Sequence, residues 1–192
     1  MGAADTIMVS TLGEYAVSGV NIIDNINNLL IIAFAALSTG GAVVVSQYIG
    51  RKELKNAGLA GRQLYYFVTL ISLLIMVIAV SFRKPIITLF YGKIENDVMS
   101  AAAVYFLITA LSYPFLAIYN AAAAVFRAAG NTRITMLIAL LVNILNIGGN
   151  AYFIFILKIG TAGAALSTLM SRIIAAAILS FRPDRSSEGT PL

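Results

Sequence analysis

Residues 64–82 read Leu-Tyr-Tyr-Phe-Val-Thr-Leu-Ile-Ser-Leu-Leu-Ile-Met-Val-Ile-Ala-Val-Ser-Phe, and this stretch contains no charged residue. A helix needs about 20 predominantly apolar residues to cross the roughly 30 Å hydrocarbon core of a bilayer. Arg83, Lys84 and Pro85 follow the stretch directly and close it. We therefore predict a membrane-spanning helix that ends near Phe82.

The composition of the whole chain agrees with this prediction. Of its 192 residues, 60% are hydrophobic and only 11% are charged. Soluble domains carry about 45–50% apolar and about 25% charged residues, so this chain has too little polar surface for a soluble protein. We predict an all-α, polytopic protein of the cell (inner) membrane.

The residue types that are missing exclude several functions. The chain has no cysteine and no histidine, which excludes disulfides, Cys or His metal sites and Cys/His or Ser/His/Asp catalysis. A membrane-embedded enzyme would also need a paired acid motif in a span, and we find none. The net charge of +5 lies in short connections between apolar runs, which indicates a topology signal rather than a nucleic-acid surface. We expect no enzyme activity, no metal or organic cofactor, no nucleic-acid partner and no cleavable signal peptide.

The same criteria of length and hydrophobicity, applied along the whole chain, predict one transmembrane lobe over residues 1–181 and a polar tail over 182–192. Its helices are expected at about 1–12 (partial), 16–48, 63–82, 98–126, 134–157 and 161–181. The first of these is too short to span a bilayer. We interpret it as the second half of a helix whose beginning is missing.

Basic residues in alternate connections predict the orientation. One side carries eight of them and the other side four. The first group is Arg51, Lys52, Lys55, Arg62, Arg127, Arg133, Arg182 and Arg185; the second is Arg83, Lys84, Lys93 and Lys158. The positive-inside rule places the first group, and with it the tail, in the cytoplasm.

A polar strip interrupts the second predicted helix. Its four members are Asn21, Asp24, Asn25 and Asn28, which follow the i, i+3, i+4, i+7 spacing of one helical face. Such a face is costly in lipid, so it faces either a water-filled cavity or neighbouring helices. We predict that it lines a substrate cavity in which Asp24 favours cationic solutes. A wet vestibule without selectivity is the alternative.

Further polar positions lie on the later spans. Thr109, Ser112, Tyr113 and Asn120 share one face of the fourth span, and Asn143, Asn146 and Asn150 share one face of the fifth. We predict that Tyr113, Asn120 and Asn143 line the cavity and that Pro114 bends the fourth span, as a hinge or as a static kink. The asparagines are equally suited to bonds between helices, each worth on the order of 1 kcal/mol.

Two charged side chains remain at membrane depth. Asp5 lies in the short apolar run at residues 2–10, and Arg172 lies near the middle of the sixth span. An ionisable group in a span is a functional-site hypothesis by default. Arg172 either pairs with Asp5 or Asp24 or extends its head towards the cytoplasm, and we favour the second arrangement because it needs no partner.

An ordered set of motifs resembles the multidrug and toxic compound extrusion (MATE) family over roughly residues 1–181. The motifs are Asp5-Thr6-Ile7-Met8-Val9 with Leu12-Gly13, Ser38-Thr39-Gly40 through Gln47-Tyr48-Ile49-Gly50, Phe126-Arg127-Ala128-Ala129-Gly130-Asn131-Thr132, and Gly163-Ala164-Ala165-Leu166-Ser167-Thr168. The resemblance implies twelve helices in two halves and alternating access driven by proton or sodium entry. This chain would then be the first half, without its C-terminal partner half.

The resemblance also implies roles for single residues. Asp5 matches the acid of the family's first helix that is associated with cation coupling, and a carboxylate in a partly wet cavity can exchange protons. Asn146 and Asn150 match polar positions on the fifth helix that belong to the same coupling site. Some members carry an aspartate in place of Asn150, and an amide cannot titrate, so a relay of two carboxylates is not expected here.

We therefore expect secondary active efflux of drugs or amphipathic, cationic metabolites by proton or sodium antiport. The expected partners are that solute, membrane lipid and the missing half. One alternative is a lipid-linked oligosaccharide flippase of the same superfamily, which would need a strongly basic cavity for pyrophosphate. Another is a truncated product that does not transport.

Overall fold

The computed structural model describes residues 7–181, and these residues are helical almost throughout. The elements are η1 (Ser10–Leu12), α2 (Glu14–Gly50), α3 (Leu54–Ser81), α4 (Arg83–Tyr91), α5 (Asn96–Leu111), α6 (Tyr113–Ala128), α7 (Thr132–Ala151), the π-helical segment η2 (Tyr152–Ile156) and α8 (Thr161–Phe181). The described part of the chain contains no strand. The prediction of an all-α protein is confirmed.

Four helical stretches are long and apolar enough to cross a membrane. They are Glu14–Gly50, Leu54–Ser81, Thr132–Ile156 and Thr161–Ser180. Helices α5 and α6, which meet at an angle of 45°, form a fifth span if they are counted together. The predicted polytopic architecture is confirmed. With its 37 residues, α2 is about 55 Å long, well beyond the thickness of the hydrocarbon core.

The structure corrects the connection that was predicted over residues 51–62. Only a short turn separates α2 from α3, because α3 begins at Leu54. Ala57 and Gly61, on the first turns of α3, are buried, so this part of the chain packs as a helix. The basic residues Lys55 and Arg62 therefore lie on α3 rather than in a loop.

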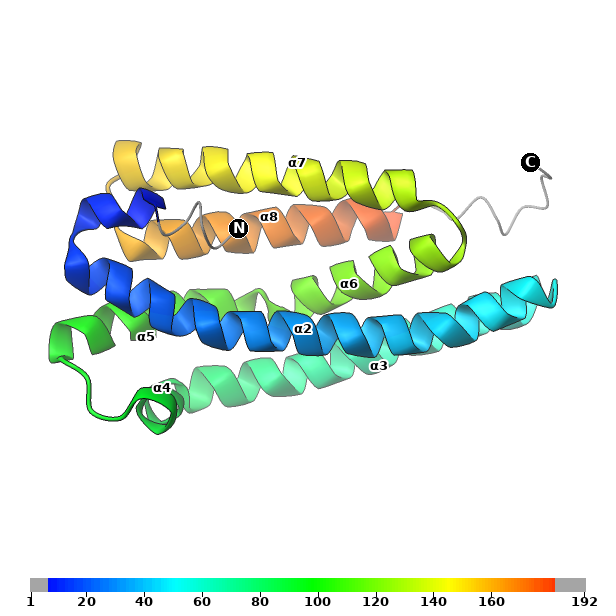
Figure 1. The fold of residues 1–192 in the computed structure, drawn as a ribbon, viewed down its shortest axis with the longest axis horizontal. Helices are drawn as coiled ribbons and strands as arrows, with labels where there is room; N and C mark the ends of the chain where they lie inside the picture. The colour runs from blue at the N-terminus through cyan, green and yellow to red at the C-terminus, as the bar shows by residue number, and fades with distance from the viewer. Residues whose placement is uncertain (1–6, 182–192) are drawn as a thin grey trace.

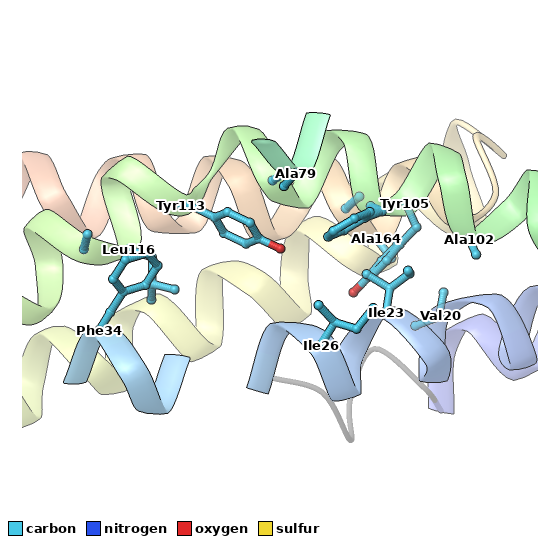
Figure 2. Packing of buried hydrophobic residues seen from close by; sticks show 14 of the residues in the cluster. Val20, Ile23, Ile26, Phe34, Ala79, Ala102, Tyr105, Tyr113, Leu116 and Ala164 are labelled. Atoms are coloured by element: carbon cyan, nitrogen blue, oxygen red, sulfur yellow. The ribbon is translucent and has the colours of Figure 1, made fainter. Parts of the chain in front are cut away.

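The helices pack side by side in one bundle (Figure 1). Helix α2 contacts α3, α5 and α6, and α8 contacts α5, α6 and α7. Small residues lie where α8 packs on its neighbours. Ala164 and Ala165 of α8 are buried in one cluster with Ala102 and Ala103 of α5, and Ala175 of α8 is buried in another with Ala122 and Ala123 of α6. Larger side chains fill the space between α2, α5 and α6, where Figure 2 shows Ile23, Ile26, Tyr105 and Tyr113.

Two basic connections lie at the same end of the bundle. Figure 1 shows the turn between α2 and α3 beside the end at which α6 turns into α7. Gly130 makes the second turn possible, because its φ of 82° lies in the left-handed region that favours glycine. The two connections had been assigned to the same membrane side. That this side is the cytoplasm stays a prediction, and Asp5 and the tail lie outside the described residues.

Candidate functional site

Two tyrosines inside the bundle bind polar side chains of α2. Tyr105 of α5 donates a hydrogen bond from Oη to Asp24 Oδ1 at 3.1 Å. Tyr113 of α6 donates one to Asn27 Oδ1 at 2.8 Å. Both tyrosines are almost completely buried, and Figure 2 shows them between the helices near Ile23 and Ile26. The two hydrogen bonds connect the polar, N-terminal half of α2 to α5 and to α6, the two parts of the bent span.

The bend between α5 and α6 is itself a polar site. Pro114 has no N–H group, so the helix cannot form its regular hydrogen bond at that position. One residue before α6, the Ser112 hydroxyl donates to the carbonyl oxygen of Thr109 at 2.6 Å. The same hydroxyl accepts a hydrogen bond from Arg172 Nη1 of α8 at 2.5 Å. The predicted bend at Pro114 is therefore present as a 45° break at Ser112, while its motion stays a prediction.

Arg172 does not extend to the membrane surface. Only 6% of the residue is exposed, and its guanidinium binds Ser112 inside the bundle. Its positive charge also favours the carboxylate form of Asp24. This corrects the expectation that Arg172 reaches towards the cytoplasm. A hydroxyl acceptor and a nearby carboxylate hold the charge in the interior, where an uncompensated ion would be costly.

These contacts define what we call the polar core. It consists of Asp24, Asn27, Tyr105, Ser112, Tyr113 and Arg172, contributed by α2, α5, the α5–α6 break, α6 and α8. It holds one acidic side chain, Asp24, and one basic side chain, Arg172. Asp24 Oδ2 is buried and has no hydrogen-bond partner among the described residues. The core is therefore polar and incompletely satisfied.

A second polar cluster joins α7 to α8. Asn146 donates from Nδ2 to Thr168 Oγ1 at 3.2 Å, and the Ser167 hydroxyl donates to the backbone carbonyl of Asn146 at 2.8 Å. Asn146 and Asn150 are both fully buried. Asn146 Oδ1 is buried without a donor among the described residues. Amide and hydroxyl oxygens suit a hard cation, although no group of three or more His, Cys, Asp or Glu residues gathers as a metal site in residues 7–181.

The other residues that were predicted to line the cavity differ in their exposure to solvent. Asn21, Asn25 and Asn28 lie exposed on α2, and Asp24 beside them is half-buried. Asn143 is exposed and donates to the carbonyl oxygen of Ala139 within its own helix at 3.0 Å.

Two predicted cavity residues instead face the interior of the bundle. Tyr113 is fully buried, and its hydroxyl is bound to Asn27. Asn120 is half-buried, and its Nδ2 is enclosed without an acceptor among the described residues. These two side chains therefore do not line an open surface in this structure.

Sequence reasoning missed Asn27 and Tyr105. Asn27 lies on α2 but not on the face of the strip, and its partner Tyr113 is 86 residues away in sequence. Tyr105 is 81 residues from Asp24. No local spacing connects positions so far apart, so the helix packing alone reveals these pairs.

Comparisons with known proteins show to which family this helical chain belongs. The MatE family model matches residues 1–152. The chain belongs to the MatE family. It is 31% identical over 182 residues to the uncharacterized transporter YisQ of Bacillus subtilis, and covers 39% of that protein with 91% of its own length. It is 27% identical to a probable multidrug resistance protein NorM of Thermotoga maritima, again covering 39% of it, with 94% of its own length.

Solved MATE structures share the fold of this lobe. A crystal structure described as MATE in the bent conformation superimposes with a TM-score of 0.88 at 22% identity, over 94% of this chain and 40% of that one. A MOP superfamily transporter from Pyrococcus furiosus gives 0.85 at 23%, over 93% and 39%. The MatE chain thus spans about two fifths of the length of the relatives it matches.

Two adjacent glycines of α7 allow a matched test of the α7–α8 contact in this MatE lobe. A Cβ at Gly149 would lie inside contact distance of Ser167 Oγ, whereas a Cβ at Gly148 would meet nothing within 4 Å. Ser167 cannot move away without losing its hydrogen bond to Asn146. We expect Gly149→Ala to destabilise the lobe by about 1–3 kcal/mol through overpacking.

The same change one residue earlier is the control. Gly148→Ala should leave stability unchanged or raise it by up to about 1 kcal/mol, because alanine is the better helix former. Thermal unfolding in detergent, followed by circular dichroism, measures both variants. Equal unfolding temperatures for the two variants would contradict the close contact between Gly149 and Ser167.

Proposed function

We propose that the chain forms one lobe of an exporter that removes amphipathic, cationic solutes in exchange for a proton or a sodium ion. The observation that carries this proposal is the exposed amide strip of α2 beside the half-buried carboxylate of Asp24. Membership of the MatE family supports transport as the general activity. The solute class and the coupling ion are the specific content of the proposal.

The strip supports a solute path because of where its polar groups lie. Asn25 and Asn28 are exposed on a helix whose other exposed residues include Leu29 and Ile32. Amide groups placed against hydrocarbon lose their hydrogen bonds to water, which is costly. In the membrane they therefore face water, a solute or a second lobe. The carboxylate of Asp24 next to them favours positively charged solutes over anions.

The α7–α8 cluster supports the coupling part of the proposal. The buried amide oxygen of Asn146, with the Thr168 hydroxyl beside it, offers oxygen ligands to an entering cation. Asn150 lies one turn further along the same face. Asp5, as the titrating group of the coupling site, would exchange the proton or balance the charge of the ion. The cation is a transported substrate in this scheme, and it leaves when the lobe changes state.

The contacts of Arg172 favour this function over a flippase. A pyrophosphate headgroup requires basic side chains that face the cavity. Arg172 instead donates to Ser112 and is enclosed by the bundle. The relative from Thermotoga maritima, described as a probable multidrug resistance protein, points in the same direction. We further propose that a second lobe completes the transport pathway, since the chain matches only about two fifths of its relatives.

Removing the amides tests the solute path. In a full-length transporter that carries this lobe, the double variant Asn25→Ala with Asn28→Ala should bind the cationic dye ethidium about tenfold more weakly, a loss of about 1.4 kcal/mol. Gln47→Ala, which removes an exposed amide at the far end of the same helix, is the control and should bind normally. Fluorescence titration measures the Kd. An unchanged Kd in the double variant would overturn the assignment of the strip.

A further inference from the structure

A large groove opens on the bundle away from the residues discussed above. Its volume is about 990 Å³, and it lies between the C-terminal end of α2, most of α3, and the C-terminal ends of α6 and α8. Its wall is mostly apolar and aromatic, with Tyr65, Tyr66, Leu73, Val125, Phe126 and Leu179 among the lining residues. Neither α7 nor the amide strip of α2 contributes to its lining. The groove is therefore separate from the proposed solute path.

The part of the groove between Arg62 and Leu73 is about as long as one leaflet of a bilayer is thick, and beyond Arg62 the lining continues to Leu54 at the basic end. It follows α3 and includes Arg62, near the basic end, and Leu73, towards the middle of the helix. The helical rise between these two residues is about 16 Å. Half of a hydrocarbon core of about 30 Å is about 15 Å. An acyl chain that begins at the level of Arg62 would reach the middle of the membrane beside Leu73.

The surface next to the groove has the character of a lipid-facing wall. Tyr66 and Leu70, which line the groove, and Leu74, which lies just beyond it on α3, are 78%, 69% and 61% exposed. Residues 64–82 of this helix carry no charge. Exposed aliphatic and aromatic side chains suit hydrocarbon, and the exposed amides of α3, Asn56 and Gln63, lie before this stretch, towards the basic end of the helix. We therefore expect the groove to open towards lipid.

The end of the groove is basic. Arg62 lines it directly. The neighbouring turns, residues 47–56 and 127–133, add Arg51, Lys52, Lys55, Arg127 and Arg133, and their sole acid is Glu53. Basic residues next to a membrane attract anionic headgroups, each contributing about 1 kcal/mol, which is about fivefold in affinity. Apolar wall and basic rim together match a phospholipid with a negatively charged headgroup.

We propose that this groove binds one anionic phospholipid, with an acyl chain between α3, α6 and α8 and the phosphate at Arg62. The bound lipid fills the space between the ends of α3 and α8. It belongs to the leaflet that meets the turn between α2 and α3. Neither the solute path nor the coupling cation is needed for this binding.

Gly58 allows the groove to be filled without disturbing the helix packing. It lines the groove, and a Cβ there would meet nothing within 4 Å. Gly40 on α2 is equally open but is not part of the lining, so Gly40→Leu is the matched control for Gly58→Leu. Arg62→Gln removes the charge while leaving the acyl groove intact.

Native mass spectrometry of the whole chain identifies the bound lipid. The chain is released from nanodiscs that contain equal amounts of phosphatidylglycerol and phosphatidylcholine with identical acyl chains. The wild-type chain and Gly40→Leu should retain one phosphatidylglycerol in preference to phosphatidylcholine. Gly58→Leu should lose the retained lipid of either kind. Arg62→Gln should keep a bound lipid but lower the preference for phosphatidylglycerol by about fivefold.

Two results would overturn the proposal. One is retention of the same lipid by Gly58→Leu as by Gly40→Leu, which would place the lipid elsewhere on the surface. The other is coverage of the groove by protein in a full-length transporter. Because the chain has no cysteine of its own, a Gly58→Cys variant can carry a fluorophore whose quenching by brominated lipid detects contact with hydrocarbon. Absence of quenching at this position, with normal quenching of a label at Leu74, which is exposed and does not line the groove, would show that protein covers the groove.

Discussion

Arg172→Met should destabilise the lobe by about 1.5–3 kcal/mol, the range for a hydrogen bond that involves a charged group. The change removes the hydrogen bond from Nη1 to Ser112 at the α5–α6 break and the attraction between the guanidinium and Asp24. The Asp24 carboxylate stays in the bundle, where Tyr105 still donates to its Oδ1. Thermal or denaturant unfolding in detergent micelles measures the loss.

Two further variants distinguish the role of Arg172 in the polar core from a general effect of replacing arginine with methionine. Arg133→Met replaces an exposed arginine at the start of α7 and should change stability by no more than about 0.5 kcal/mol. Combining Arg172→Met with Asp24→Asn removes both charges and should recover part of the loss, giving a coupling energy of about 0.5–3 kcal/mol. Similar effects of Arg172→Met and Arg133→Met would contradict the role of Arg172 in the interior.

The fold was predictable because the membrane imposes one strong rule. A chain that crosses hydrocarbon must satisfy its backbone internally, so long apolar runs become helices of predictable number. The start of α3 was not predictable in the same way. Residues 54–62 contain basic residues and glycines, a composition typical of a loop. The structure shows a helix there, and burial of Ala57 and Gly61 in the bundle stabilises it. That burial depends on the packing of the bundle.

The candidate site was predictable only along single helices. The spacing of Asn25 and Asn28 predicted that both amides share one face of α2, and both are exposed in the structure, while their role in lining a cavity stays a prediction. The partners of Asp24 and Asn27 come from α5 and α6, more than 80 residues away. The spacing of residues along one helix cannot predict such pairs. Arg172 shows the same limit, because its location depends on a hydroxyl that the α5–α6 break exposes to α8.

Asp5→Asn should abolish efflux driven by a pH gradient, while binding of the solute stays measurable. The proposal gives Asp5 the titrating role, and the amide of asparagine keeps the size of the side chain but cannot exchange a proton. The other candidate coupling residues, Asn146 and Asn150, are themselves amides and cannot replace the lost carboxylate. Glu14→Gln, which neutralises an exposed acid at the start of α2, is the matched control and should transport normally.

The most direct test is the rate of ethidium efflux from proteoliposomes under an imposed pH gradient, using a full-length transporter that carries this lobe. The proposed mechanism predicts that Asp5→Asn falls to the rate of protein-free liposomes and still binds the dye, while Glu14→Gln matches the wild type. Efflux by Asp5→Asn at the wild-type rate would contradict cation coupling through this lobe.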